Sequence, residues 1–369
     1  MANVLDIRRR IRSVVNTRQI TKAMKTVSAA KLRRAQEGAM AARPYAQMLT
    51  NVLKSLVSRA NIYDPVSGEP LHPLLAERPE KTILLIVVTG DKGLAGAFNT
   101  NILKMASKFI SSTIESKPDV NIDIECIGRK GRDFMRRRYP MAPPRPADET
   151  VADGATGVSP VQPDAAPKRA GRVQIVGEYV GVLGKLDYNF ANTLSEKVVA
   201  SYSRGEIDGV YILFNEFKSV IAQRLVAERV LPIKEIGEVD IHMAEEASEE
   251  ERKQRLEAAK TAGVSVRPSD TTAVDEAAAK FGTAQVDYIY EQPPAELFRG
   301  ILPKYIGIQI FHALLESVAA EHAARMTAMD AATINASDMI DSLTLIMNRA
   351  RQAKITKEII EIVSGAAAQ

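Results

Sequence analysis

The sequence predicts an α/β protein in which long N- and C-terminal helices form an antiparallel coiled coil and carry a central α/β domain. Three observations lead to this fold class. Apolar residues have helical spacing over residues 1–60, they have it again over residues 290–369, and short β-branched runs lie between these segments. With 369 residues, 46% of them hydrophobic, the chain can bury one large core or two ordinary ones.

The first long helix is expected over residues 1–60. Its apolar residues recur every three or four positions with one phase slip near residue 17, and they include Val4, Ile7, Ile11, Val14, Ile20, Met24 and Val27. Pro44 lacks an amide hydrogen, so we expect it to kink or interrupt the helix near Arg43. Residues 1–59 carry thirteen Lys or Arg against only Asp6 and Glu37, so this helix is strongly basic.

That basic charge has three interpretations: a nucleic-acid arm, a mitochondrial presequence, or a helix that faces acidic surfaces of a partner. A presequence rarely runs this long, and no aromatic residue stands among the arginines before Tyr45. The chain has no apolar run of about 18 residues, which excludes a transmembrane helix, and its start does not read as a secretory signal. The single cysteine, Cys126, cannot form an internal disulfide, which favours a reducing compartment.

The central α/β domain is expected over residues 80–235. Apolar runs predict strands at 82–89, 120–127, 173–179, 209–214 and 220–230, the last near the edge of the sheet, and helices follow Asn99, surround Phe134 and begin at Tyr188. Such short β-branched runs are typical of strands buried on both faces of a parallel sheet.

Two stretches depart from this alternation. Residues 141–170 are rich in Pro, Ala, Gly and Asp, and we expect a disordered insertion there. Residues 237–285 are interpreted as a surface insertion, in which the charged segment 244–262 forms a solvated helix.

The second long helix is expected within residues 290–369, starting at Pro293-Pro294 and capped by Gly365. From Leu315 its apolar residues follow a heptad-like seam made of Leu315, Val318, His322, Met329, Ala332, Ala336, Met339, Leu343, Ile346, Ala350 and Ala353, widened by Met326, Ile340 and Met347. Helices this long need a partner, and the middle of the chain offers none. The two terminal helices are therefore predicted to pair antiparallel.

No catalytic, cofactor-binding or metal-ligating residue is predicted. The glycine-rich turn at 89–99 has neither common phosphate-loop spacing, so a tight structural turn is favoured over phosphate binding, and the domain is Rossmann-like in fold alone. The four histidines, at 72, 242, 312 and 322, have no metal-ligand spacing. His322 lies on the helical seam, where packing or pairing with a carboxylate is favoured over base catalysis.

Long segments of the chain resemble the gamma subunits of bacterial-type F-type ATP synthases. The strings that carry the resemblance are IRSVVNTRQITKAMKTVSAAKLRRAQ at 11–36, GDKGLAGAFNTN at 90–101, DYIYEQPPAELFRGILPKYIGIQIFHALL at 287–315, and ARMTAMDAATINASDMIDSLTLIMNRARQAKITKEIIEIVSG at 324–365. Residues 141–170 and 237–285 fall outside the common pattern. Ala95 stands where many members have cysteine.

The resemblance implies a non-catalytic rotor of the central stalk that couples proton-driven rotation of the c-ring to ATP synthesis or hydrolysis on beta subunits. Its shaft would lie inside the hexamer of alpha and beta subunits, and its α/β domain would contact epsilon and the c-ring. It would lie at the cytoplasmic face of the bacterial inner membrane, attached only through the complex, without cofactor or nucleic acid. The rival hypotheses are a nucleotide-dependent α/β enzyme and a basic nucleic-acid-binding coiled coil.

The resemblance also implies site residues. Arg351 and Gln352, with Thr356 and Glu358 one turn further on, occupy the positions of a catch against an acidic loop of beta, and Lys22, Met24 and Lys25 accompany them on the other helix; a solvated helix face is the alternative. Small residues along the last helix are expected in a narrow rotor shaft, and they are expected equally in the packed seam of any coiled coil. Residues 237–285 stand where chloroplast gamma subunits have a redox segment but contain no cysteine, so redox-independent activity is expected; their role as a brake, an epsilon contact or an inert loop stays open.

Overall fold

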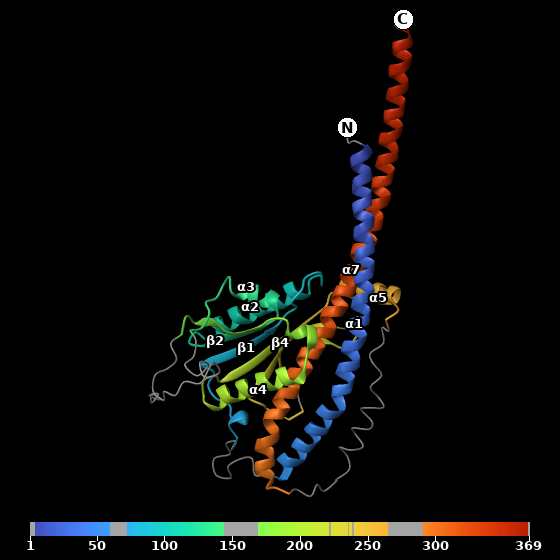
Figure 1. Ribbon diagram of the computed structural model, residues 1–369. Coiled ribbons are helices and arrows are strands. Elements are labelled where there is room, and N and C mark those ends of the chain that lie inside the picture. Colours follow the sequence, from blue (N-terminus) through green and yellow to red (C-terminus); the bar gives the residue numbers. More distant parts are fainter. Residues whose placement is uncertain are drawn as a thin grey trace, which may run out of the picture.

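Two long helices run side by side through the molecule, and a sheet domain packs against them (Figure 1). The structure is a computed structural model that describes residues 4–59, 72–143, 169–220, 223–234, 236–237, 240–264 and 291–367. Most of the expected insertion at 141–170, and residues 265–285 of the second one, lie outside the described residues.

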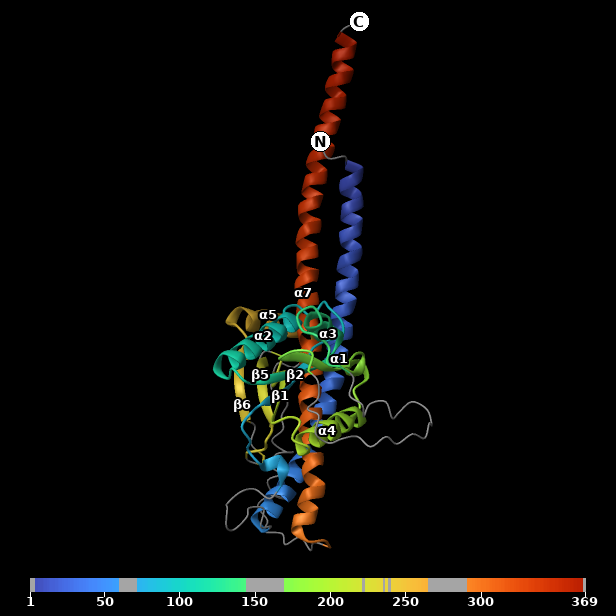
Figure 2. The same ribbon diagram turned by 90° about the vertical axis from the view of Figure 1, so that its left-hand side faces the viewer.

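The helices are α1 (Val4–Arg59) and α7 (Pro294–Ala367), and they are antiparallel. The Thr21 and Thr333 hydroxyls are 2.8 Å apart, and a Cβ on Gly38 would lie 3.9 Å from Cδ2 of Leu315. As residue numbers rise along α1, those of the partners on α7 fall. Both termini therefore lie toward the same end of the pair, where α7 extends beyond α1 (Figure 2). The predicted fold class is confirmed.

Two expected helix limits differ from the structure. Helix α1 continues through Pro44 without interruption, and α7 runs past Gly365 to Ala367. Buried Leu49, Leu53 and Leu56 pack into the main core after the proline. This packing keeps the segment helical although one backbone hydrogen bond is lost at Pro44.

The seam on α7 is also displaced from its predicted line. Met326, Met329 and Ala336 are buried, but Met339 and Ile346 are 54% and 46% exposed. Their neighbours Ile340 and Met347 are half-buried instead. The spacing of apolar residues shows how often the seam repeats along the helix. Where two neighbouring residues are both apolar and both repeat with that period, spacing alone cannot show which of them is buried.

The central domain has a mixed six-stranded sheet in the order β3-β2-β1-β4-β5-β6. The parallel strands are β1 (Thr82–Val88), β2 (Asn121–Ile127), β3 (Val173–Tyr179) and β4 (Gly209–Phe217); β5 (Gln223–Leu231) and β6 (Asp240–Glu246) are antiparallel additions. The strand expected at the edge, β5, is therefore internal, because β6 covers it.

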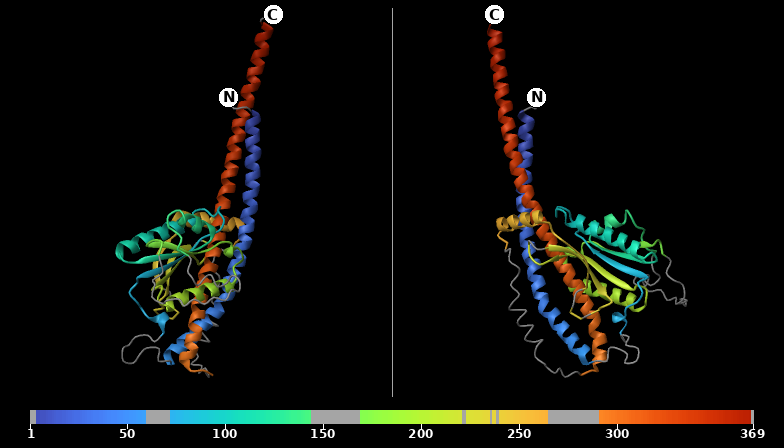
Figure 3. Two further views of the ribbon diagram at one scale, coloured as in Figure 1. Left: turned by 60° about the vertical axis from the view of Figure 1, so that its left-hand side comes forward. Right: turned by 180° about the vertical axis from the view of Figure 1, so that it is seen from behind.

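Helices cover both faces of this sheet (Figure 3). Ile83, Leu85 and Val87 of β1 join the core beneath α2 (Phe98–Ser116) and α3 (Arg129–Met135). The alternate residues of β1 face α4 (Tyr188–Ser203) and the two long helices. One strand thus supplies both cores, as the absence of polar alternation in its sequence predicts.

The segment expected as a solvated surface insertion is partly built into the fold. Its first part is β6, and its second is α5 (Glu249–Ala262), which packs on α7. Ala258 and Ala259 of α5 are buried, and Arg33 of α1 donates a 2.6 Å hydrogen bond to the Gly263 carbonyl. Small alanines let this mostly charged helix approach closely, which its overall polarity does not reveal.

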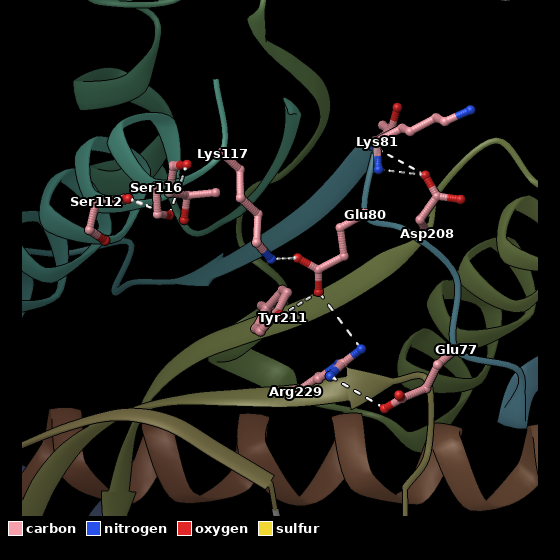
Figure 4. Close-up of polar contacts among 11 residues, drawn as sticks. Glu77, Glu80, Lys81, Ser112, Ser116, Lys117, Asp208, Tyr211 and Arg229 are labelled. Atoms are coloured by element: carbon pink, nitrogen blue, oxygen red, sulfur yellow. Dashed lines mark hydrogen bonds and ion pairs between the residues drawn. The ribbon is translucent and has the colours of Figure 1, made fainter. Parts of the chain in front are cut away.

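A polar cluster links the amino ends of β1 and β4 to the carboxyl end of β5 and to the end of α2 (Figure 4). Glu80 precedes β1 and accepts hydrogen bonds from Lys117, at the end of α2, and from the Tyr211 hydroxyl of β4 at 2.8 Å. Arg229 of β5 lies 3.7 Å from the same carboxylate. Burial opposes ionisation of Glu80, but Lys117 and Tyr211 hold its pKa below the usual value. The Glu80 carboxylate is therefore partnered, and its role is structural.

Candidate functional site

The C-terminal end of α7 projects past the end of α1. Lys25 lies beside Asp330 and Thr21 beside Thr333, so the start of α1 lies near residue 350 of α7. Residues 351–364 are all exposed. The projecting segment up to Ala367 is about 25 Å long at the α-helical rise per residue. Within the part of the chain that the structure describes, these turns have no partner helix.

Four of the sequence-predicted site residues lie on this projection: Arg351, Gln352, Thr356 and Glu358. Arg351 and Glu358 are two turns apart and share one face, and Gln352 and Thr356 lie on the adjoining face. The Thr356 hydroxyl donates to the Gln352 carbonyl at 3.0 Å, and Glu358 lies 3.6 Å from the Lys354 ammonium. The backbone therefore brings these four together on one side of an exposed helix.

The other three predicted residues, Lys22, Met24 and Lys25, lie elsewhere. They are on α1 at the level of residues 330–333 of α7. At the α-helical rise per residue, this level is about 30 Å from Arg351 along the pair of long helices. Lys22 is exposed and Met24 is half-buried. The Lys25 ammonium is buried against Asp330 at 2.5 Å. The structure does not bring the two groups together.

Exposed apolar side chains on the same projection were missed by the sequence reasoning. Ile355, Ile359 and Ile360 are 48%, 54% and 58% exposed, and Ile362 and Val363 are more exposed still. An apolar patch of this kind on a helix end marks a surface that a partner covers. The sequence contains a signal for this surface, because apolar residues continue along the last helix beyond the length that the shorter first helix can cover.

The glycine-rich turn at 89–99 contacts α7. Arg325 of α7 donates to the Gly93 carbonyl at 3.4 Å and to Glu321 at 2.5 Å, and a Cβ on Gly90 would lie 2.7 Å from the Glu321 carboxylate. Burial, and then the Arg325 charge, lower the pKa of His322 to about 4, so this imidazole is neutral at pH 7. Its Nδ1 lies 3.3 Å from Arg325, so of the two expected roles, packing or pairing with a carboxylate, the structure favours packing, here beside a cation.

Comparison with known proteins decides the family. A family model described as ATP synthase matches residues 3–369. The ATP synthase gamma chain of Solibacter usitatus is 44% identical over 368 residues, covering 100% of this chain and 99% of that one. The gamma chain of Geobacter metallireducens is 41% identical over 367 residues, covering 99% and 98%. The chain belongs to the ATP synthase gamma chain family.

This membership confirms the predicted family and makes the chain a non-catalytic subunit of the central stalk of an F-type ATP synthase. A nucleotide-dependent enzyme and a nucleic-acid-binding coiled coil are set aside. A structure of Euglena gracilis mitochondrial ATP synthase contains a chain of similar fold, with a TM-score of 0.50 and 15% identity, covering 99% of this chain and 94% of that one. In the described part of this gamma chain, no helix is apolar over a length that would cross a bilayer.

Proposed function

We propose that this gamma chain is the rotating shaft that couples rotation of a proton-driven c-ring to ATP synthesis or hydrolysis on beta subunits. The observation that carries the proposal is the projection of α7 beyond α1. An isolated helix with exposed isoleucines is poorly stabilised in water, so residues 351–367 need a surrounding protein surface. A ring of alpha and beta subunits around the projection provides one.

The catch is proposed to be Arg351, Gln352, Thr356 and Glu358. A guanidinium can hold a carboxylate through two parallel hydrogen bonds, and both are lost when the shaft turns. An acidic loop of a beta subunit is the complementary partner. Since an exposed ion pair contributes only about 0–1 kcal/mol, the catch acts with the shape and the apolar contacts of the shaft.

Lys22 and Met24 are proposed to contact beta at a second, lower level of the shaft. The ammonium of Lys25 is already bonded to Asp330, so we assign it to holding the two helices together. An angle of the shaft favours one conformation of a catalytic site only through a difference in contact energy. A change from about 1:99 to 99:1 needs roughly 5.5 kcal/mol, which several contacts at both levels must share.

The sheet domain is proposed to contact the epsilon subunit and the c-ring. It lies at the opposite end of the shaft from the projection, which suits a chain that joins a membrane ring to a catalytic head (Figure 1). We propose that in a bacterium the chain lies at the cytoplasmic face of the inner membrane, attached to it only through the complex.

Co-purification tests the proposal. A tagged copy of the full chain, expressed with the complete complex, should recover alpha, beta, epsilon and c subunits together. A matched variant with Ile359 and Ile362 changed to Glu should retain epsilon and the c-ring but recover less alpha and beta. Recovery of the chain without alpha and beta subunits, or equal recovery by the variant, would refute the role of the projection.

A further inference from the structure

One face of α7 is polar where the helix passes the sheet. This polar stripe consists of Tyr305, Gln309, His312 and Glu316, whose spacing of four, three and four positions puts them on one side of a helix. Tyr305 and Glu316 are only 5% and 9% exposed. The Tyr305 hydroxyl accepts a hydrogen bond of 2.9 Å from the Gly237 amide. The polar stripe is therefore part of the packed interface between the long helices and the sheet domain.

Two strands place further carboxylates opposite this stripe. Glu216 lies two positions after Phe214 on β4, and Glu228 lies two positions after Val226 on β5. Since Phe214 and Val226 belong to the main core, both glutamates share the face of the sheet that meets α7. Both also act electrostatically on Glu316. Glu216, Glu228 and Glu316 thus form an acidic joint between β4, β5 and α7.

The cations beside the acidic joint pair with only one of its members. Arg224 of β5 donates a hydrogen bond to the Glu216 carboxylate, and the Lys218 ammonium lies 3.7 Å from it. Among the described residues, no lysine or arginine comes within ion-pair distance of Glu228 or Glu316. Glu228, like Glu316, is only 9% exposed, so two nearly buried carboxyl groups lack a counter-charge.

Two further groups face Glu316, and neither balances its charge. Arg43 of α1 favours the ionised carboxylate, but less than burial and Glu216 oppose it. The His312 ring lies 3.4 Å from a carboxylate oxygen of Glu316. Burial, and then the charge of Arg43, lower the pKa of His312, so the imidazole is neutral at pH 7 and supplies no positive charge.

A carboxyl group in such surroundings keeps its proton, because the ionised form would lose hydration without gaining a counter-charge. In agreement with this geometry, burial and Glu216 raise the pKa of Glu316 to about 8. Once Glu316 ionises, it faces the charges of Glu216 and Glu228 across the interface that holds the sheet on α7. Separation of the two surfaces would admit water and relieve both the repulsion and the lost hydration.

We propose that the acidic joint is a proton-dependent contact between the sheet domain and the long helices. With Glu316 protonated, β4 and β5 stay packed along the polar stripe of α7. With Glu316 ionised, the packing opens along this stripe, while the apolar core around it keeps the domain attached. In the assembled complex the joint would control how firmly the sheet domain turns the long helices, and this consequence alone rests on the proposed function.

Hydrogen exchange of the full chain, followed by mass spectrometry at pH 6.5 and 8.5, tests the joint. After correction for the intrinsic pH dependence of exchange, protection of residues 223–231 and 305–316 should fall roughly tenfold, because the joint releases about one proton over this range. Protection of α2, which packs on the other face of the sheet, should not change. Glu316→Gln imitates the protonated side chain and should remove most of the fall, whereas Glu296→Gln, at an exposed position of the same helix, should respond as the wild type does.

Glu216→Gln tests the cause of the response. It removes the charge that, after burial, most opposes ionisation of Glu316, so protection should begin to fall at a lower pH than in the wild type. Because exchange is measured on the chain itself, the result does not depend on assembly with other subunits. The proposal is overturned if wild-type protection is the same at both pH values, if it falls equally in α2, or if Glu316→Gln loses as much protection as the wild type.

Discussion

The ammonium of Lys25 on α1 lies 2.5 Å from a carboxylate oxygen of Asp330 on α7, and the two side chains are only 11% and 10% exposed. The Thr21 and Thr333 hydroxyls meet one turn further along. Together these contacts define the register of the shaft, because sliding one helix by a single residue would separate a nearly buried charge from its partner.

Breaking this ion pair should destabilise the chain. Asp330→Ala leaves a nearly buried ammonium without a counter-charge, and the free energy of unfolding should fall by about 3 kcal/mol. The double variant Lys25→Met with Asp330→Leu replaces both charges by apolar groups and should recover most of that loss. Urea unfolding followed by far-ultraviolet circular dichroism gives both values. Equal stability of Asp330→Ala and the wild type would show that the pair does not hold the register.

Arg351→Ala should slow ATP hydrolysis by up to about fivefold in the assembled complex, the factor that corresponds to one exposed ion pair. The complex should still assemble, since shape and apolar contacts remain. Lys357→Ala, on another face of the same exposed helix, is the matched control and should keep the wild-type rate. The catch proposal fails if the two variants hydrolyse ATP at the same rate.

Met24→Lys should reduce coupling more than it reduces hydrolysis. Met24 is half-buried beside the paired Lys25, so a second ammonium there would be pushed outward toward the surrounding subunits. Proton pumping per ATP hydrolysed in inverted vesicles should fall, and Met24→Leu should leave the ratio unchanged. A normal ratio with Met24→Lys would identify this position as a bystander.

The stability of the chain should decrease as pH rises, because of Glu316. Burial, and then the charge of Glu216, raise the pKa of Glu316 to about 8, and burial raises that of Glu228 to about 7. The charged or titratable groups around Glu316 are Arg43 of α1, Glu216 of β4, Arg224 and Glu228 of β5, and His312 of α7; Lys218, just after β4, lies beside Glu216.

The direction of this pH dependence follows from the difference in the number of protons bound by the folded and the unfolded chain. An unfolded glutamate titrates near pH 4.3, so between about pH 4.5 and 8 the folded chain holds a proton that the unfolded chain has lost. Stability therefore falls across this range. Glu316→Gln should flatten the fall of the thermal midpoint between pH 5 and 9, measured by calorimetry, whereas the exposed Glu296→Gln should not. Parallel curves for wild type and Glu316→Gln would contradict this account.

Activity should not respond to thiol reduction. Cys126 is the one cysteine of the chain; it is fully buried on β2, and burial raises its pKa to about 12. A buried thiol with so little thiolate at neutral pH is inert. Dithiothreitol should leave hydrolysis by the assembled enzyme unchanged, and a thiol reagent should label the folded chain only after denaturation. A rate change on reduction that disappears when residues 237–285 are deleted would refute this.

The expectation for residues 237–285 shows where sequence reasoning failed. Its charged middle segment has little apolar periodicity, so nothing in the local pattern indicates that Ala258 and Ala259 face the shaft. The strand β6 was missed for a related reason: as an edge strand it buries little, and its alternation is weak. Helix α5 is held by α7, which is distant in the chain, and β6 is held by backbone pairing with β5; neither kind of contact leaves a periodic signal in the segment itself.

The sequence by itself determined the two long helices, the buried strands between them and the family, because helical period, β-branched runs and long motif strings are local properties of the chain. Only the tertiary structure decided that Lys25 belongs to Asp330 and not to a partner surface, and that Met339 points outward. Each of these depends on which surfaces meet when residues hundreds of positions apart pack together, and side-chain spacing along one helix or strand carries no information about the opposite surface.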